Sequence, residues 1–148
     1  MDILAYEKKY WEKNVKYVAG IDEAGRGPLA GPVVAACVIF DKYINIEGIT
    51  DSKKISPKKR LELFHVIREK AIDVSIGIAN EHEIDKLNIL QATFLAMKRS
   101  VGNLKVEPQQ LLIDGPYSDI KLYSVETIIK GDNKSLSIAA ASIIAKVT

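Results

Sequence analysis

Cysteine is almost absent from this 148-residue chain, since Cys37 is the only one. No disulfide can therefore form within the chain, and Cys37 stands in an apolar segment where a buried structural thiol is expected. Long apolar runs are missing as well: none approaches the roughly 18 residues of a membrane span, and the N-terminus has no signal-peptide core. We therefore expect a cytoplasmic protein without a membrane partner.

An excess of charge of one sign is also lacking, because 21 Lys and Arg residues face 19 Asp and Glu residues, a net charge of +2. A positive net charge this small does not by itself imply that the protein binds nucleic acid. His65 and His82 show no metal-ligand spacing, and no Walker loop or Ser-His-Asp arrangement is present. Repeats, low-complexity segments and linkers are missing too, so we expect one domain over residues 1–148.

The most informative segment is residues 20–32, Gly-Ile-Asp-Glu-Ala-Gly-Arg-Gly-Pro-Leu-Ala-Gly-Pro. A strand-like run over 17–21 leads into Asp22 and Glu23, and another over 33–40 follows the glycine-rich turn. Neighbouring side chains of a strand point to opposite faces, so these carboxylates can meet at one ion only if the strand is ending there. Carboxylates beside Arg26 suit a divalent cation and a phosphodiester. A polar hairpin tip is the alternative.

A dinucleotide-binding loop does not fit this segment. Its glycine spacing is one residue off the fingerprint, Pro28 lies inside it, and a strand-like run follows where that loop must open a helix.

Another acidic residue, Asp114, follows an apolar run in the same way as Asp22. It comes directly after the run 110–113 and is followed by Gly115. Such a run is typical of a strand buried on both faces. Alone, an Asp-Gly-Pro sequence is explained by a turn. Together with Asp22 and Glu23, it favours a metal site where two strands end.

Two further segments carry candidate phosphate contacts. Five cations crowd residues 53–60: Lys53, Lys54, Lys58, Lys59 and Arg60. Ser56 is expected to cap a helix that Pro57 opens; cations at that end oppose the helix dipole, so phosphate binding or a solvated helix start would explain them. The last helix is expected to start near Lys134, Ser135 and Ser137. These residues could cap the helix or bind a phosphate, and the sequence leaves both alternatives open.

The hydrophobic pattern predicts an α/β fold, with a mixed sheet flanked by helices. Helices are expected over 1–14, from 57 onward, over 81–101 and over 137–146; strands over 17–41 in two runs, 74–79, 110–114 and 125–129. The chain stops at Thr148 with no Gly or Pro stop signal in what should be a continuing helix. We therefore expect it to be truncated.

These segments together resemble the ribonuclease HII family. The resemblance rests on five blocks in the family's order: 20–32, 51–53, 84–93, 112–115 and 134–148. It implies a ribonuclease H-like fold with a mixed five-stranded sheet, lacking the family's C-terminal helical part. It also implies that the protein is a monomeric endonuclease, a hydrolase that acts on RNA–DNA hybrids.

The activity that this resemblance implies is endonucleolytic. Its substrates would be the RNA strand of RNA–DNA hybrids and duplex DNA that carries single ribonucleotides, cut on the 5′ side of the ribonucleotide, as ribonucleotide removal from DNA requires. Two ions, Mn²⁺ or Mg²⁺, held about 3.5–4 Å apart would drive hydrolysis to 5′-phosphate and 3′-hydroxyl ends.

The resemblance also assigns residues to roles. Asp22, Glu23 and Asp114 match the first three of four metal-binding carboxylates, and the fourth would fall beyond Thr148. The loop that contacts the ribose 2′-hydroxyl matches Gly25, Arg26 and Gly27. Backbone phosphates would be held by Lys53, Lys134 and Ser135. The alternative is a catalytically disabled nucleic-acid-binding fragment that lacks the fourth carboxylate.

Overall fold

A computed structural model describes residues 2–25, 31–49 and 54–148 of the chain. Its strands form one five-stranded sheet in the order β3-β2-β1-β4-β5. The bounds are β1 (Val18–Ala24), β2 (Val33–Ile39), β3 (Asp73–Ala79), β4 (Gln110–Asp114) and β5 (Val125–Ile128). β2 pairs antiparallel with both β1 and β3, whereas β4 pairs parallel with β1 and with β5. The predicted mixed five-stranded sheet is confirmed.

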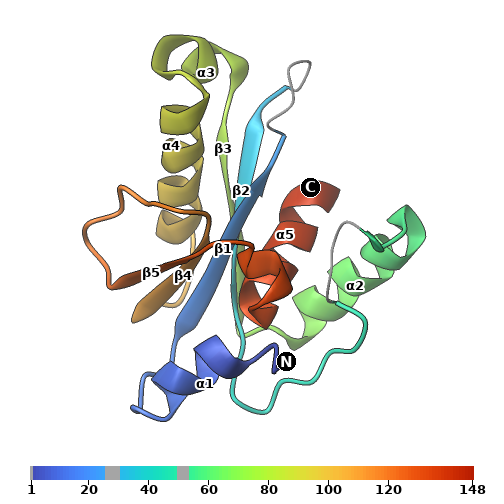
Figure 1. The fold of residues 1–148 in the computed structure, drawn as a ribbon. Helices are drawn as coiled ribbons and strands as arrows, with labels where there is room; N and C mark the ends of the chain where they lie inside the picture. Colours follow the sequence, from blue (N-terminus) through green and yellow to red (C-terminus); the bar gives the residue numbers. More distant parts are fainter. Residues whose placement is uncertain (1, 26–30, 50–53) are drawn as a thin grey trace.

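Helices cover both faces of this sheet. They are α1 (Ala5–Trp11), α2 (Pro57–Lys70), α3 (Glu81–Leu87), α4 (Ile89–Gly102) and α5 (Leu136–Val147), with a 3-10 turn at Gly131–Asn133. Figure 1 shows α5 and α2 on one side of the sheet and α4 on the other. No helix in the described part of the chain is long and apolar enough to cross a membrane.

The predicted single helix over residues 81–101 was wrong, because α3 and α4 are separate helices that meet at Asn88. This asparagine has a φ of 75°, a conformation that Asn tolerates better than most residues. Its side chain accepts a hydrogen bond from the Gln91 N–H (3.0 Å) and so caps α4. Asn80 caps α3 in the same way, and Glu83 completes a capping box. The helix over 1–14 was also predicted too long, since α1 has seven residues.

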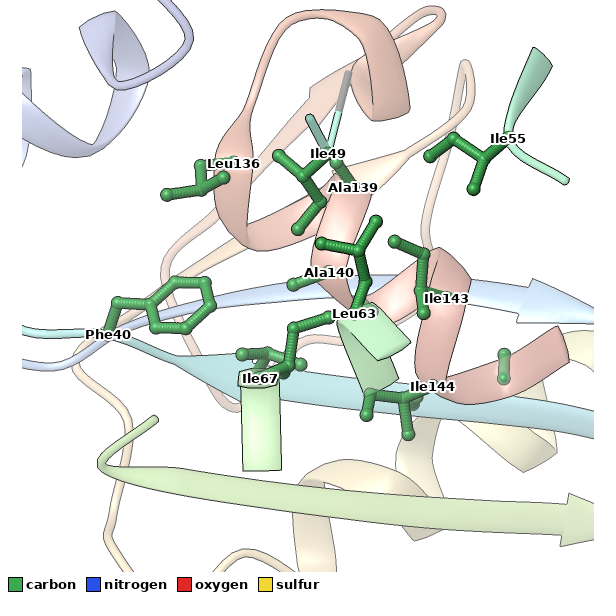
Figure 2. Close-up of a cluster of buried hydrophobic side chains, with 14 residues drawn as sticks. Phe40, Ile49, Ile55, Leu63, Ile67, Leu136, Ala139, Ala140, Ile143 and Ile144 are labelled. Atoms are coloured by element: carbon green, nitrogen blue, oxygen red, sulfur yellow. The ribbon is translucent and has the colours of Figure 1, made fainter. Parts of the chain in front are cut away.

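Hydrophobic side chains pack on each side of the sheet. Figure 2 shows the cluster that joins β2 to α2 and α5, which includes Phe40, Leu63, Ile67, Ile143 and Ile144. On the opposite face, Ala92, Ala96 and Met97 of α4 pack against β1 and β2. Cys37 lies fully buried in that second cluster, as its apolar surroundings in the sequence predicted.

Two glycines let helices approach the backbone of the sheet. A Cβ atom at Gly20 of β1 would lie only 2.2 Å from the carbonyl carbon of Ser137 in α5. On the other face, a Cβ at Gly77 of β3 would lie 2.2 Å from the carbonyl oxygen of Ala96 in α4. Glycine in a strand often marks such a close approach. Each helix can therefore lie this close to the sheet only because glycine has no side chain at these two positions.

One edge of the sheet, β3, is covered by side chains from the end of α4. The Arg99 Nη1 donates to the carbonyl oxygen of Ile78 (2.6 Å), and the Asn103 Nδ2 donates to that of Ile76 (2.8 Å). Arg99 is itself held by Glu83, whose Oε1 accepts from Nη1 at 2.8 Å. These outward-facing carbonyls of an edge strand are therefore hydrogen-bonded within the molecule.

Candidate active site

Asp22 and Asp114 lie at the same level of two neighbouring parallel strands. The register of β1 and β4 pairs Ile21 with Ile113, and the next residue on each strand is one of these aspartates. Side chains alternate along a strand, so Asp22 shares its face with Gly20, the face on which α5 rests. Asp22 is only 6% exposed. Two carboxylates from distant parts of the chain are thus brought together beneath α5.

The electrostatic environment of these two carboxylates opposes their ionisation. Burial raises the pKa of Asp22 well above its usual range, and the negative charges of Asp114 and Glu23 raise it further, although the Glu23 N–H donates to Asp22 Oδ1 at 2.8 Å. Burial also raises the pKa of Asp114, against a hydrogen bond that the Gly131 N–H donates to its Oδ1 at 2.7 Å. A cation beside the pair would favour the charged forms.

Glu23 is placed differently from the two aspartates. The strand does not end at the Asp22–Glu23 pair, as the sequence led us to expect, because β1 stays paired with β2 through Ala24 and Val34. Glu23 therefore follows Asp22 within a continuous strand. Among residues 2–25, 31–49 and 54–148, no group of three His, Cys, Asp or Glu side chains is arranged to hold a metal ion. Metal binding by Asp22, Glu23 and Asp114 together stays a prediction.

Gly25 follows β1 directly and starts the glycine-rich turn. Its φ is +89°, and a Cβ there would lie 2.4 Å from the carbonyl oxygen of Pro32, so only glycine fits without strain. Gly25 and Pro32 therefore lie close together just beyond β1, the strand that carries Asp22 and Glu23. Arg26, Gly27 and Lys53 lie outside the described residues, and their predicted contacts with substrate stay predictions.

The prediction that Ser135 binds a phosphate is not supported by its position. Ser135 is fully buried at the N-cap of α5, where its Oγ accepts from the Ile138 N–H (3.2 Å) and donates to Glu7 Oε2 (2.8 Å). Its hydroxyl is therefore engaged in capping and does not face solvent. Lys134 is partly exposed just before the helix. Lys134 remains a candidate phosphate contact.

Sequence analysis missed two residues next to this site, Gly131 and Glu7. The Gly131 N–H holds Asp114, and a Cβ at Gly131 would lie 3.3 Å from Asp114 Oδ1 and 2.7 Å from Ile138 Cδ1. The Gly-Asp-Asn sequence after β5 is a recognisable turn signal that could have drawn attention to Gly131. Glu7 gives no local signal, because its partners lie about 130 residues away.

Solved structures place this fold in the class of ribonuclease H-like proteins. The ribonuclease H2 from Pyrococcus horikoshii OT3 matches with a TM-score of 0.77 at 31% identity, over 88% of this chain and 71% of that chain. The Bst ribonuclease HIII in complex with Mn²⁺ matches with a TM-score of 0.72 over 89% of this chain and 51% of that chain. At 21% identity, this second likeness concerns the fold alone.

Sequence comparison identifies the family within that class. The family model of ribonuclease HII matches residues 19–148. The ribonuclease HII of Clostridioides difficile (strain 630) is 56% identical over 146 residues, which are 97% of this chain and 56% of that relative. The chain belongs to the ribonuclease HII family. It spans 56% to 58% of the length of the curated relatives it matches.

Proposed function

We propose that the protein is an endonuclease that degrades the RNA strand of RNA–DNA hybrids and cuts on the 5′ side of single ribonucleotides in duplex DNA. The observation that carries this proposal is the pair formed by buried Asp22 and half-buried Asp114, which lie at the same level of the adjacent parallel strands β1 and β4 in a chain of the ribonuclease HII family. Like charges held close together and partly withdrawn from water are costly to a fold. Their retention at one point of the sheet supports a functional site.

The pair, together with Glu23, would hold the divalent cation, Mn²⁺ or Mg²⁺. Carboxylate oxygens are the ligands that such hard cations prefer. When bound, the cation supplies Lewis-acid stabilisation of the charge that develops on the phosphodiester. The chain orients its own ligands for this task, because the N–H groups of Glu23 and Gly131 each hold one aspartate oxygen.

Recognition of the substrate would come from the turn after β1 and from nearby lysines. We assign the ribose 2′-hydroxyl to Gly25, Arg26 and Gly27, since that hydroxyl is what distinguishes RNA from DNA. Gly25 supports this role because its positive φ and its close contact with the Pro32 carbonyl oxygen fix the start of this turn directly after β1. Lys53 and Lys134 would contact backbone phosphates, which position a duplex without reading its sequence. Little sequence preference is therefore expected.

The test is cleavage of a DNA duplex with one ribonucleotide, beside an all-DNA duplex, in Mg²⁺ and in Mn²⁺. We expect one cut on the 5′ side of the ribonucleotide, with 5′-phosphate and 3′-hydroxyl ends, and none in the control duplex. Asp22→Asn should abolish the cut and keep hybrid binding. Asp41→Asn is the matched control, because Asp41 is exposed beyond the opposite end of the sheet.

Two results would contradict the assignment. Undiminished cleavage by Asp22→Asn would remove Asp22 from the site. Hybrid binding without any cut in either metal would favour the alternative, a nucleic-acid-binding protein without turnover.

A further inference from the structure

The carboxylate of Glu7 is buried in the interior, and it is the only buried residue of the seven-residue helix α1. Glu7 is fully buried, and its Oε2 accepts hydrogen bonds from the Ser135 Oγ and the Ser137 N–H, each at 2.8 Å. Its other oxygen, Oε1, has no hydrogen-bond partner among the described residues. Glu7 therefore joins the first helix to the N-terminal end of the last one.

This contact is more than a cap for α5. Ser135 already caps that helix by accepting from the Ile138 N–H, and a neutral serine is sufficient for capping. Burial raises the pKa of Glu7, so the carboxylate sits where its charged form is disfavoured. Burying a carboxylate with one unpaired oxygen costs folding free energy, so a gain in stability does not explain Glu7. The position in which Glu7 holds the N-terminal end of α5 explains it better.

A short series of hydrogen bonds continues from this point to the candidate site. The Ser135 N–H donates to the Gly131 carbonyl oxygen at 2.8 Å. The Gly131 N–H in turn donates to Asp114 Oδ1 at 2.7 Å. Together with the Glu7–Ser135 bond, three hydrogen bonds connect α1 to the carboxylate of Asp114. A Cβ at Gly131 would lie 2.7 Å from Ile138 Cδ1, so α5 packs closely against this glycine.

We propose that Glu7 is a positioning residue for the Asp22–Asp114 pair, which fixes the end of α5 and, through Ser135 and Gly131, the orientation of the Asp114 carboxylate. Glu7 lies outside residues 19–148, the part that the family model matches. The proposal rests on the proposed function for its catalytic meaning. Its structural content can be tested without activity.

The experiment measures two quantities in Glu7→Ala, Glu7→Gln and wild type. One is the hydrogen-exchange rate of the Gly131 amide relative to that of Leu112 in the centre of β4, by NMR. The other is the Mn²⁺ dissociation constant, from free Mn²⁺ detected by electron paramagnetic resonance. For Glu7→Ala we expect a relative exchange rate at least about 10-fold higher and Mn²⁺ binding about 10-fold weaker. Glu7→Gln should recover most of both, because its amide oxygen can still accept from Ser135 and Ser137.

Two control variants separate positioning from general effects. Met97→Ala destabilises the opposite face of the sheet and should leave both quantities near wild type. Glu12→Gln removes an exposed charge next to the same helix and should change neither. If Glu7→Ala does not fold, Glu7→Asp shortens the side chain by one methylene and replaces it.

Several results would overturn the proposal. An unchanged Gly131 exchange ratio in Glu7→Ala, an equal change in Met97→Ala, or unchanged Mn²⁺ affinity despite a loosened Gly131 would each leave Glu7 a structural residue only. If wild type binds no Mn²⁺, the proposed metal site fails, whereas the exchange ratio still decides whether Glu7 orients Asp114.

Discussion

Replacing Gly20 with alanine perturbs the contact between β1 and α5 at a defined point. The new Cβ would lie 2.2 Å from the Ser137 carbonyl carbon and 2.4 Å from the Ile138 nitrogen, both backbone atoms that cannot rotate away. Ordinary contact begins at 3.4 Å, so the helix must move outward by about 1.2 Å. Residues Leu136 to Ala145 of α5 are all buried, and such a movement disturbs the packing of the whole helix.

The cost follows from this geometry. Overpacking a core costs about 1–3 kcal/mol, and a clash with helix backbone belongs at the upper end of that range. A loss of about 3 kcal/mol lowers the Tm of a domain of this size by roughly 6–12 °C. Urea unfolding followed by circular dichroism measures the free energy, and a thermal scan measures the Tm.

The matched control for this experiment is Gly102→Ala. Gly102 is the last residue of α4, and a Cβ there would meet nothing within 4 Å. The same chemical change should therefore stabilise the protein by about 0.4–1 kcal/mol, through the lower entropy of the unfolded chain. A loss below about 1 kcal/mol in Gly20→Ala, or equal losses in both variants, would refute the steric argument.

Three other variants or reagents test the buried polar groups. With metal removed, Asp22→Asn should raise the free energy of unfolding by about 1–3 kcal/mol at pH 8. Because the pKa of Asp22 is raised in the folded state, the wild-type protein loses stability as the pH rises from about 3.8. Urea unfolding at a series of pH values should show that the difference in stability between wild type and variant vanishes below that pH. Burial raises the pKa of Cys37 to about 12, so a thiol reagent at pH 8 should react only after unfolding. Asp73→Ala leaves the N–H groups of Lys105 and Val106 without their acceptor, and chemical unfolding should show a loss of about 2–3 kcal/mol.

The parts of the fold that sequence predicted correctly are those set by local pattern. Ser56 and Pro57 marked the start of α2, and the Ser56 Oγ accepts from the Lys59 N–H as a cap should. The apolar run that ends in Asp114 is a buried strand, β4. Because caps and strand periodicity act within a few residues, they are visible before any tertiary contact is known.

The errors arose where distant segments decide the outcome. Ser135 looked equally suited to a cap or to a phosphate, and only the arrival of Glu7 from α1 buries its hydroxyl. The strand was expected to end at Asp22 and Glu23, but β1 continues to Ala24 because it stays paired with β2. Asn88 is the exception, because the spacing from Asn88 to Gln91 is a local capping signal that was overlooked.

The covered edge of β3 has a consequence for the protein at high concentration. A bare sheet edge is a template on which a strand from another molecule can add, and repeated addition builds a fibril. Here an incoming strand would have to displace Arg99 and Asn103 from the carbonyls of Ile78 and Ile76, and Arg99 is also tied to Glu83. Growth of aggregates from this side of the molecule therefore meets a barrier before its first intermolecular bond can form.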